Sequence, residues 1–368
     1  MMIRAGVSPR PDAFPQASAQ LRPIGSRTRR RGTTRLMTAT GKTRTRTAAG
    51  ALLVAAMMAC TAVAAEPTAK QIFGSQHAAA ALPSASHGFY SKGCLAGAAQ
   101  LPADGPAWQA MRLSRDRRYG HPNTIDFLER LSREAAARGV WPGLLVGDIS
   151  QARGGPMPSG HASHQIGLDA DIWLQPMPAG RLTPEAREDF PFRSVLKPGT
   201  FQVDDRVWTS NYRDLIRMAA EDPKVQRIFV HPGIKKKLCE TTGRERAWLN
   251  KVRPYYGHHE HFHVRLFCQP GSPGCTAQRS TGSGDGCGDL DWWFDVALQP
   301  PKPGGKPAKP KPPMMLADMP DACRQVANAP ARFDGGGGVV AASMAAPAGA
   351  LGYAPEVRVP IPTNRPIR

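Results

Sequence analysis

Apolar residues recur with helical spacing in the stretch that runs from residue 124 to residue 139 (TIDFLERLSREAAARG). This spacing predicts an amphipathic helix, with Thr124 as its cap and Gly139 at its end. Its apolar face consists of Ile125, Leu128 and Leu131.

Shorter patterns predict further helices and several strands. The helices are expected at residues 207–221 and 244–252, and the strands at 144–150, 169–174, 227–230 and 261–268. A Gly/Ser/His-rich loop fills residues 151–168, and residues 66–107 show few periodic signals. Helices and strands thus alternate irregularly, and tight hairpin signals are few, so we expect an α+β fold with a central antiparallel sheet, flanking helices and long loops.

The chain divides into four regions by composition. Residues 1–65 form an N-terminal extension with a signal peptide, and residues 66–299 form the main domain. From residue 300 on there are fourteen prolines in 69 residues, which predicts an extended or disordered tail rather than a packed one. Within it we expect a Pro/Lys-rich connector with a disulfide-anchored segment over residues 300–330, and a disordered tail over residues 331–368.

The N-terminal region has the pattern of an export signal. Residues 1–46 hold eleven basic residues and one acid, residues 48–65 are uncharged and apolar, and Ala62-Val63-Ala64 fits a cleavage site. Met37 gives a signal of ordinary length if translation starts there. The apolar stretch is short for a membrane span, so we expect no stable span in the mature protein. An uncleaved anchor and a lipid on Cys60 are the alternatives.

The net charge of +19 suggests nucleic-acid binding at first sight. However, residues 1–46 carry +10 of it and the tail from residue 300 carries +5, which leaves +4 for residues 66–299. No helix-turn-helix, zinc finger or aromatic-studded basic sheet is present, so we expect no nucleic-acid partner. A hydrophobic content of 41% excludes disorder of the whole chain.

Six cysteines remain once Cys60 is set aside. An even number in an exported chain predicts three disulfides and an oxidising compartment, which in a bacterium is the periplasm. Spacing alone leaves 15 connectivities open. Cys268 and Cys275 flank a short Gly/Pro loop that suits a local bridge, and none of the six has the C-x-x-C spacing of a zinc ribbon.

Six of the ten histidines fall in two short windows. The first, SGHASHQIGLDADIW, holds His161 and His164 with Asp169 and Asp171; the second, YYGHHEHFHVRLF, holds His258, His259, His261 and His263. Strand alternation places His261 and His263 on the same face of their strand. Asp169 and Asp171 likewise share a face of theirs.

Two imidazoles and a carboxylate from these windows would supply the ligand set of a catalytic zinc, which activates water for amide hydrolysis. A spare histidine would serve as general base or oxyanion donor. The competing interpretation is a surface histidine tract that binds metal adventitiously. The strand pattern of the second window argues against it. We assign the isolated histidines ordinary surface or core positions: His77, His87, His121 and His231.

The motifs H-x6-D (His164 to Asp171) and H-x-H (His261-Phe262-His263), with the flanks RIFVHPGIKKKLC, AWLNKVRP and SGDGCG, resemble the penicillin-insensitive murein endopeptidases. This family belongs with the lysostaphin-type, D-Ala-D-Ala-peptidase and hedgehog-like zinc proteins, so the resemblance implies their zinc fold. It covers roughly residues 80–325.

The resemblance also implies roles for individual residues. His164, Asp171 and His263 would bind zinc, with His161 as an additional contact. His261 would be the catalytic histidine, and His258 a further active-site histidine. His259 has no role in the pattern. The implied disulfides are Cys94–Cys323, Cys239–Cys287 and Cys268–Cys275.

The implied activity is that of a periplasmic zinc endopeptidase whose partner is cross-linked peptidoglycan. It would hydrolyse the bond between D-alanine and meso-diaminopimelate with water as nucleophile, and would be insensitive to penicillin because no acyl-serine forms. Two alternatives remain: a D,D-carboxypeptidase that trims stem peptides, and a non-catalytic cell-wall binding protein with the same zinc site.

Overall fold

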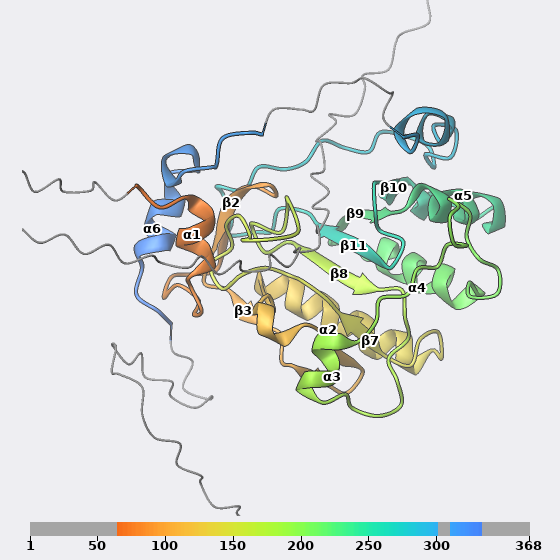
Figure 1. Cartoon of the computed structure of the whole chain (residues 1–368), viewed down its shortest axis with the longest axis horizontal. Coiled ribbons are helices and arrows are strands. Elements are labelled where there is room, and N and C mark those ends of the chain that lie inside the picture. The colour runs from red at the N-terminus through yellow and green to blue at the C-terminus, as the bar shows by residue number, and fades with distance from the viewer. Residues whose placement is uncertain (1–64, 301–309, 333–368) are drawn as a thin grey trace, which may run out of the picture.

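A computed structural model describes residues 65–300 and 310–332 (Figure 1). The predicted signal peptide, Cys60 and the tail beyond residue 332 lie outside the described residues. The longer helices are α1 (Ala69–Gly74), α2 (Pro122–Ala137), α3 (Pro184–Asp189), α4 (Ser210–Glu221), α5 (Pro232–Thr241) and α6 (Ala322–Asn328). Short helical turns are η1 (Leu113–Arg115), η2 (Ala247–Lys251), η3 (Trp293–Ala297) and η4 (Leu316–Asp318). The described part of the chain holds no helix with the length and apolar character that crossing a membrane requires.

A seven-stranded sheet is the centre of the fold, in the order β10-β9-β11-β8-β7-β5-β4. Its strands are β4 (Asp104–Gly105), β5 (Trp108–Ala110), β7 (Leu144–Val146), β8 (Asp169–Trp173), β9 (Val225–Val230), β10 (Val252–Pro254) and β11 (His261–Leu266). Two small antiparallel pairs lie outside it: β1 (Ala85–Phe89) with β2 (Lys92–Ala96), and β3 (Ala99–Gln100) with β6 (Tyr119–Gly120).

The sheet is mixed, so the expectation of an antiparallel sheet is wrong for two strand pairs. β5 pairs with β7 and β9 pairs with β10 in parallel. In both cases a helix lies between the strands in sequence, α2 in the first and α5 in the second, and such a crossover returns the chain in the same direction. The pairs β11–β8, β11–β9 and β7–β8 are antiparallel as expected.

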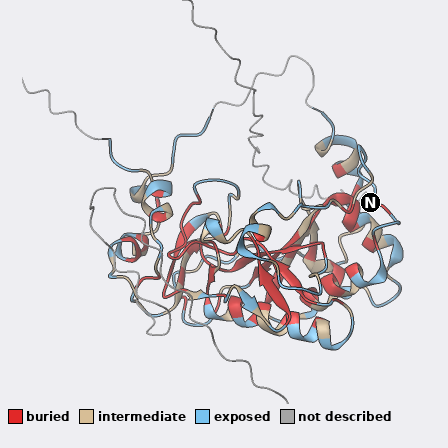
Figure 2. Ribbon diagram, turned by 60° about the horizontal axis from the view of Figure 1, so that its bottom comes forward, coloured by how far each residue is buried: buried red, intermediate tan, exposed pale blue. Residues whose placement is uncertain are grey.

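The main core lies between one face of this sheet and helices α2 and α4. Ala170 and Ile172 of β8, with Phe262 and Val264 of β11, are buried in the same apolar cluster as the inner faces of the two helices. Figure 2 shows this burial along the central strands. The opposite face of β8 and β11 is therefore left for other residues, and it carries the histidines and aspartates.

Helix α2 occurs where the periodicity predicts it, but its cap differs. The helix begins at Pro122, and the side chain of His121 accepts a hydrogen bond from the N–H of Asn123 (3.2 Å). Thr124, the expected cap, donates its hydroxyl to Gly167 O instead (2.7 Å). Proline at the first helical turn is favourable because that position needs no donor.

Part of the segment 310–332 is packed, contrary to the expectation of an extended or disordered tail, and the expected disulfide anchors it. Helix α6 lies beside α1 and β2 (Figure 1), where Cys323 and Val326 share an apolar cluster with Phe73. The buried Arg153 donates to the carbonyls of Val326, Ala327 and Ala329 at the end of the helix. The disulfide and the burial of its apolar side chains hold helix α6 in place despite the prolines around it.

Three disulfides cross-link the described chain: Cys94–Cys323, Cys239–Cys287 and Cys268–Cys275. This is the pairing that the family resemblance implies. The first fastens α6 to strand β2, the second links α5 to the loop before η3, and the third closes a short loop after β11.

Candidate metal centre and active site

Strands β8 and β11 place the polar residues of the site opposite one another. Their antiparallel register pairs Asp169 with Arg265, Asp171 with His263, and Trp173 with His261. All six side chains belong to the face turned away from the main core, because successive residues of a strand alternate between its faces. The alternation predicted for both windows is thus present, and the register adds which residues meet.

His164 comes from the loop before β8 and is held in one orientation. Its backbone is left-handed (φ 69°), and its N–H donates to Asp169 Oδ2 (3.0 Å). The ring is fully buried, and Nδ1 donates to Ile149 O (2.7 Å). The other nitrogen, Nε2, lies 3.5 Å from Asp171 Oδ1, so it faces the carboxylate.

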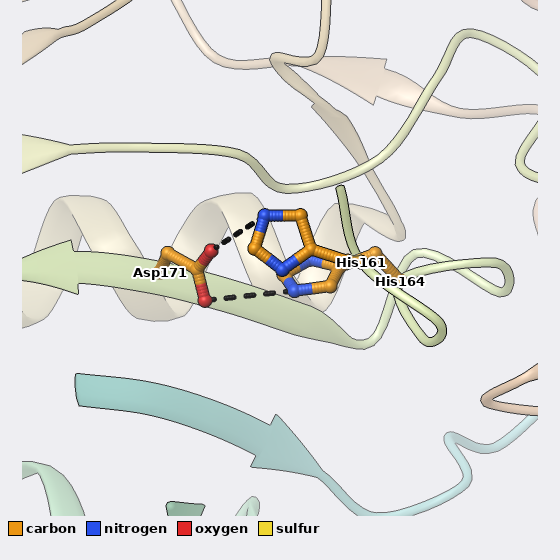
Figure 3. Close-up of side chains that lie close together, drawn as sticks. All are labelled: His161, His164 and Asp171. Atoms are coloured by element: carbon orange, nitrogen blue, oxygen red, sulfur yellow. Dashed lines mark ion pairs between the residues drawn. The ribbon is translucent and has the colours of Figure 1, made fainter. Parts of the chain in front are cut away.

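Asp171 faces both loop histidines, one with each carboxylate oxygen, as Figure 3 shows. Its Oδ1 faces His164, and its Oδ2 lies 3.3 Å from His161 Nε2. His161 Nε2 is also 3.3 Å from Oδ2 of Asp148, a buried carboxylate that accepts a hydrogen bond from Arg117 (2.8 Å). Asp148 thus orients His161 toward Asp171.

His263 lies between two carboxylates. Its Nδ1 is 3.3 Å from Asp171 Oδ1, and its Nε2 is 3.0 Å from Asp169 Oδ1. Asp169 is fully buried and also forms a two-contact ion pair with Arg265, from Nε (2.7 Å) and Nη2 (3.1 Å). One carboxylate therefore fixes the backbone of His164 and the ring of His263 together.

His261 and His258 complete the cluster from β11 and the turn before it. His261 Nε2 is 3.7 Å from Asp171 Oδ1, and the His258 ring is centred 4.9 Å from that of His261. His258 has a left-handed backbone (φ 55°), and its Nδ1 donates to Tyr256 O (2.6 Å). His259 differs: its Nδ1 contacts Ser194 Oγ (3.0 Å), and it takes no part in the cluster.

The electrostatics of the cluster are dominated by Asp171. Burial alone would raise the pKa of this carboxyl, but His161, His261 and His164 lower it well below its ordinary value. Burial would likewise lower the pKa of His164, but Asp171 raises it to about 9. Burial lowers the pKa values of both His261 and His258. The carboxylate thus attracts positive charge in the position a metal cation would take.

The residues fit a bound metal ion. His161, His164 and Asp171 bring one ligand atom each to within 4.8 Å of one another. His164 Nε2 and Asp171 Oδ1 are buried and have no hydrogen-bond partner in the described structure, an arrangement that is costly unless something else binds them. Imidazole nitrogens with one carboxylate are ligands that suit zinc.

The structure brings together all the site residues expected from the sequence. His164, Asp171 and His263 are in mutual contact, His161 contacts Asp171 directly, and His261 and His258 lie beside them. Sequence reasoning missed Asp169 and Asp148 as supporting carboxylates. The role of Asp169 could have been inferred from its position two residues before Asp171, because this spacing places both carboxylates on one face of the strand.

Comparison with known proteins agrees with this geometry. Residues 86–328 match the model of the family described as penicillin-insensitive murein endopeptidase. A protein of that name from Haemophilus influenzae is 48% identical over 248 residues, which cover 67% of this chain and 83% of the relative. One from Klebsiella pneumoniae is 42% identical over 240 residues (63% and 82%), and one from Yersinia enterocolitica is 42% identical over 250 residues (67% and 86%). The chain therefore belongs to the penicillin-insensitive murein endopeptidase family.

Proposed function

We propose that this protein is a zinc metallo-endopeptidase of the periplasm that hydrolyses the D-alanyl–meso-diaminopimelyl cross-links of peptidoglycan. The observation that carries the proposal is the cluster of His164, Asp171 and His263, in which the buried His164 Nε2 and Asp171 Oδ1 have no hydrogen-bond partner among the described residues. Family membership supports peptidoglycan as the substrate. Three disulfides support an oxidising compartment.

The roles of the ligand residues follow from their orientation. His164 would bind the metal through Nε2, Asp171 through Oδ1 and His263 through Nδ1, because these atoms face one another. His161 would be an additional contact through Nε2. When bound, zinc supplies Lewis-acid polarisation of a carbonyl and a water that ionises near neutral pH.

The remaining histidines would handle protons. His261 Nε2 is directed at the pocket beside Asp171 and has no hydrogen-bond partner among the described residues, so it is free to bond to a reacting group. It would take up the proton of the attacking water or donate to the oxyanion of the scissile D-alanyl carbonyl. His258, whose Nδ1–H is held by Tyr256 O, would assist from behind His261.

Single substitutions separate these roles. His263→Ala should remove bound zinc and activity together, whereas His261→Ala should remove activity and keep most of the zinc. His259→Ala is the matched control, since this neighbouring histidine contacts Ser194 and should keep both. Metal content and digestion of cross-linked muropeptides are measured on each protein. A His261→Ala protein that digests them at the normal rate would refute the assignment.

A further inference from the structure

An open pocket adjoins the metal cluster. His161, Asp171 and His261 line it together with Arg115, Trp173 and Phe192. The Trp173 and Phe192 rings are centred 4.1 Å apart and form an apolar wall. A substrate that reaches the metal cluster through this pocket would therefore come close to this wall and to Arg115.

Arg115 is a partly exposed cation of this pocket with spare hydrogen-bonding capacity. Its Nη1 lies 3.2 Å from Asp148 Oδ2, and 41% of its side chain is exposed. Asp148 already pairs with Arg117, which is closer (2.8 Å) and only 7% exposed. A guanidinium has five N–H donors. In the described part of the chain, the single contact to Asp148 is the one hydrogen bond that the Arg115 side chain makes.

The neighbouring Arg112 has a different role. It donates to the carbonyl of Phe190 (2.9 Å), and its guanidinium lies over the rings of Trp173 (5.5 Å) and Phe192 (5.3 Å). The Arg112 guanidinium thus stabilises the apolar wall through this hydrogen bond and through cation–π contacts with the two rings. This leaves Arg115 as the cation that an incoming anionic group would meet.

The cross-link itself offers such a group. In a D-alanyl–diaminopimelyl bond, the carbon attached to the scissile nitrogen carries a free carboxylate. We propose that Arg115 binds this carboxylate and so determines specificity for it, an inference that rests on the proposed function. Arginine suits the task because its planar fork binds carboxylates through two parallel hydrogen bonds.

The test compares two cross-linked muropeptide dimers, one with this carboxylate free and one with it amidated. The unaltered protein should cleave the free dimer with a kcat/KM about 10- to 100-fold higher. Arg115→Gln should lose the preference by slowing cleavage of the free dimer only. Arg115→Lys should keep part of it. Arg133→Gln, at an exposed site on α2, is the matched control and should keep all of it.

Binding measured without turnover keeps this inference separate from the proposed function. In the His261→Ala background, Arg115→Gln should lower affinity for the free dimer and leave affinity for the amidated dimer unchanged. An equal preference with and without Arg115, in both cleavage and binding, would overturn the inference. If neither dimer is cleaved but the binding preference still depends on Arg115, the proposed function fails and the carboxylate site stands.

Discussion

Asp169 and His263 lie on neighbouring strands with Asp169 Oδ1 3.0 Å from His263 Nε2, while His263 Nδ1 faces Asp171. A carboxylate behind a metal-binding histidine fixes the ring and raises the basicity of its free nitrogen. The same carboxylate accepts the backbone N–H of His164. Asp169 thus orients two of the proposed metal ligands, His164 and His263.

Asp169→Asn should therefore weaken zinc binding by about 10- to 100-fold. It should also destabilise the fold, because Arg265 loses its buried charge partner. Competition with a chromophoric chelator measures the affinity on protein shown to be folded by circular dichroism. Asp189→Asn, an exposed acid at the end of α3, serves as the control. Unchanged zinc affinity in Asp169→Asn would mean that the carboxylate does not position the ligands.

His121 predicts a loss of stability in mild acid. Its ring is buried at the start of α2, and burial, with the charge of Lys224, lowers its pKa to about 4. The unfolded chain, whose histidine has a pKa near 6.5, binds the proton more readily between these values. The contribution of His121 to the free energy of unfolding should therefore be fully present above about pH 6.5 and should be lost, by about 3 kcal/mol, as the pH drops toward 4.

Two substitutions isolate this effect in urea unfolding curves. His121→Asn keeps an acceptor for the helix N–H but does not titrate, so its stability should fall less steeply from pH 6.5 to 4. His121→Ala loses the cap as well and should be about 1 kcal/mol less stable than the Asn variant throughout. Equal slopes in the native and Asn proteins would show that another group controls the acid response.

The Cys94–Cys323 disulfide should contribute more stability than Cys268–Cys275. The first joins residues 229 apart in sequence and the second joins residues 7 apart. A longer closed loop restricts the unfolded chain more, about 5 kcal/mol against about 2–3 kcal/mol by loop entropy. Paired Cys→Ser variants, compared by urea unfolding, measure the difference. A greater loss from opening the short loop would contradict this order.

Much of the site could be predicted because strand alternation is a local property. The patterns DADIW and HFHVRLF each place two polar side chains on one face, and the structure confirms both strands. Two residues of one strand share a face whatever the rest of the fold does, so no long-range information is needed.

The register of β8 with β11 and the path of the loop that holds His164 could not be predicted in the same way. That His263 meets Asp171 depends on how two strands 90 residues apart align. The position of His164 depends on a left-handed backbone whose N–H donates to Asp169, and on the Ile149 carbonyl, which accepts from the ring. The packing of α6 against β2 depends on the Cys94–Cys323 disulfide, which the family resemblance implies, and also on the contacts of Arg153, which no local pattern in the sequence shows.

The most direct test of the account is digestion of purified cross-linked muropeptide dimers, with and without a zinc chelator. We predict that dimers are converted to monomers without release of free D-alanine, that the chelator abolishes the reaction, and that added zinc restores it. Monomers formed at an undiminished rate in protein shown to be free of metal would contradict the zinc mechanism. Release of D-alanine alone would identify a carboxypeptidase, and binding without any product would identify a cell-wall binding protein.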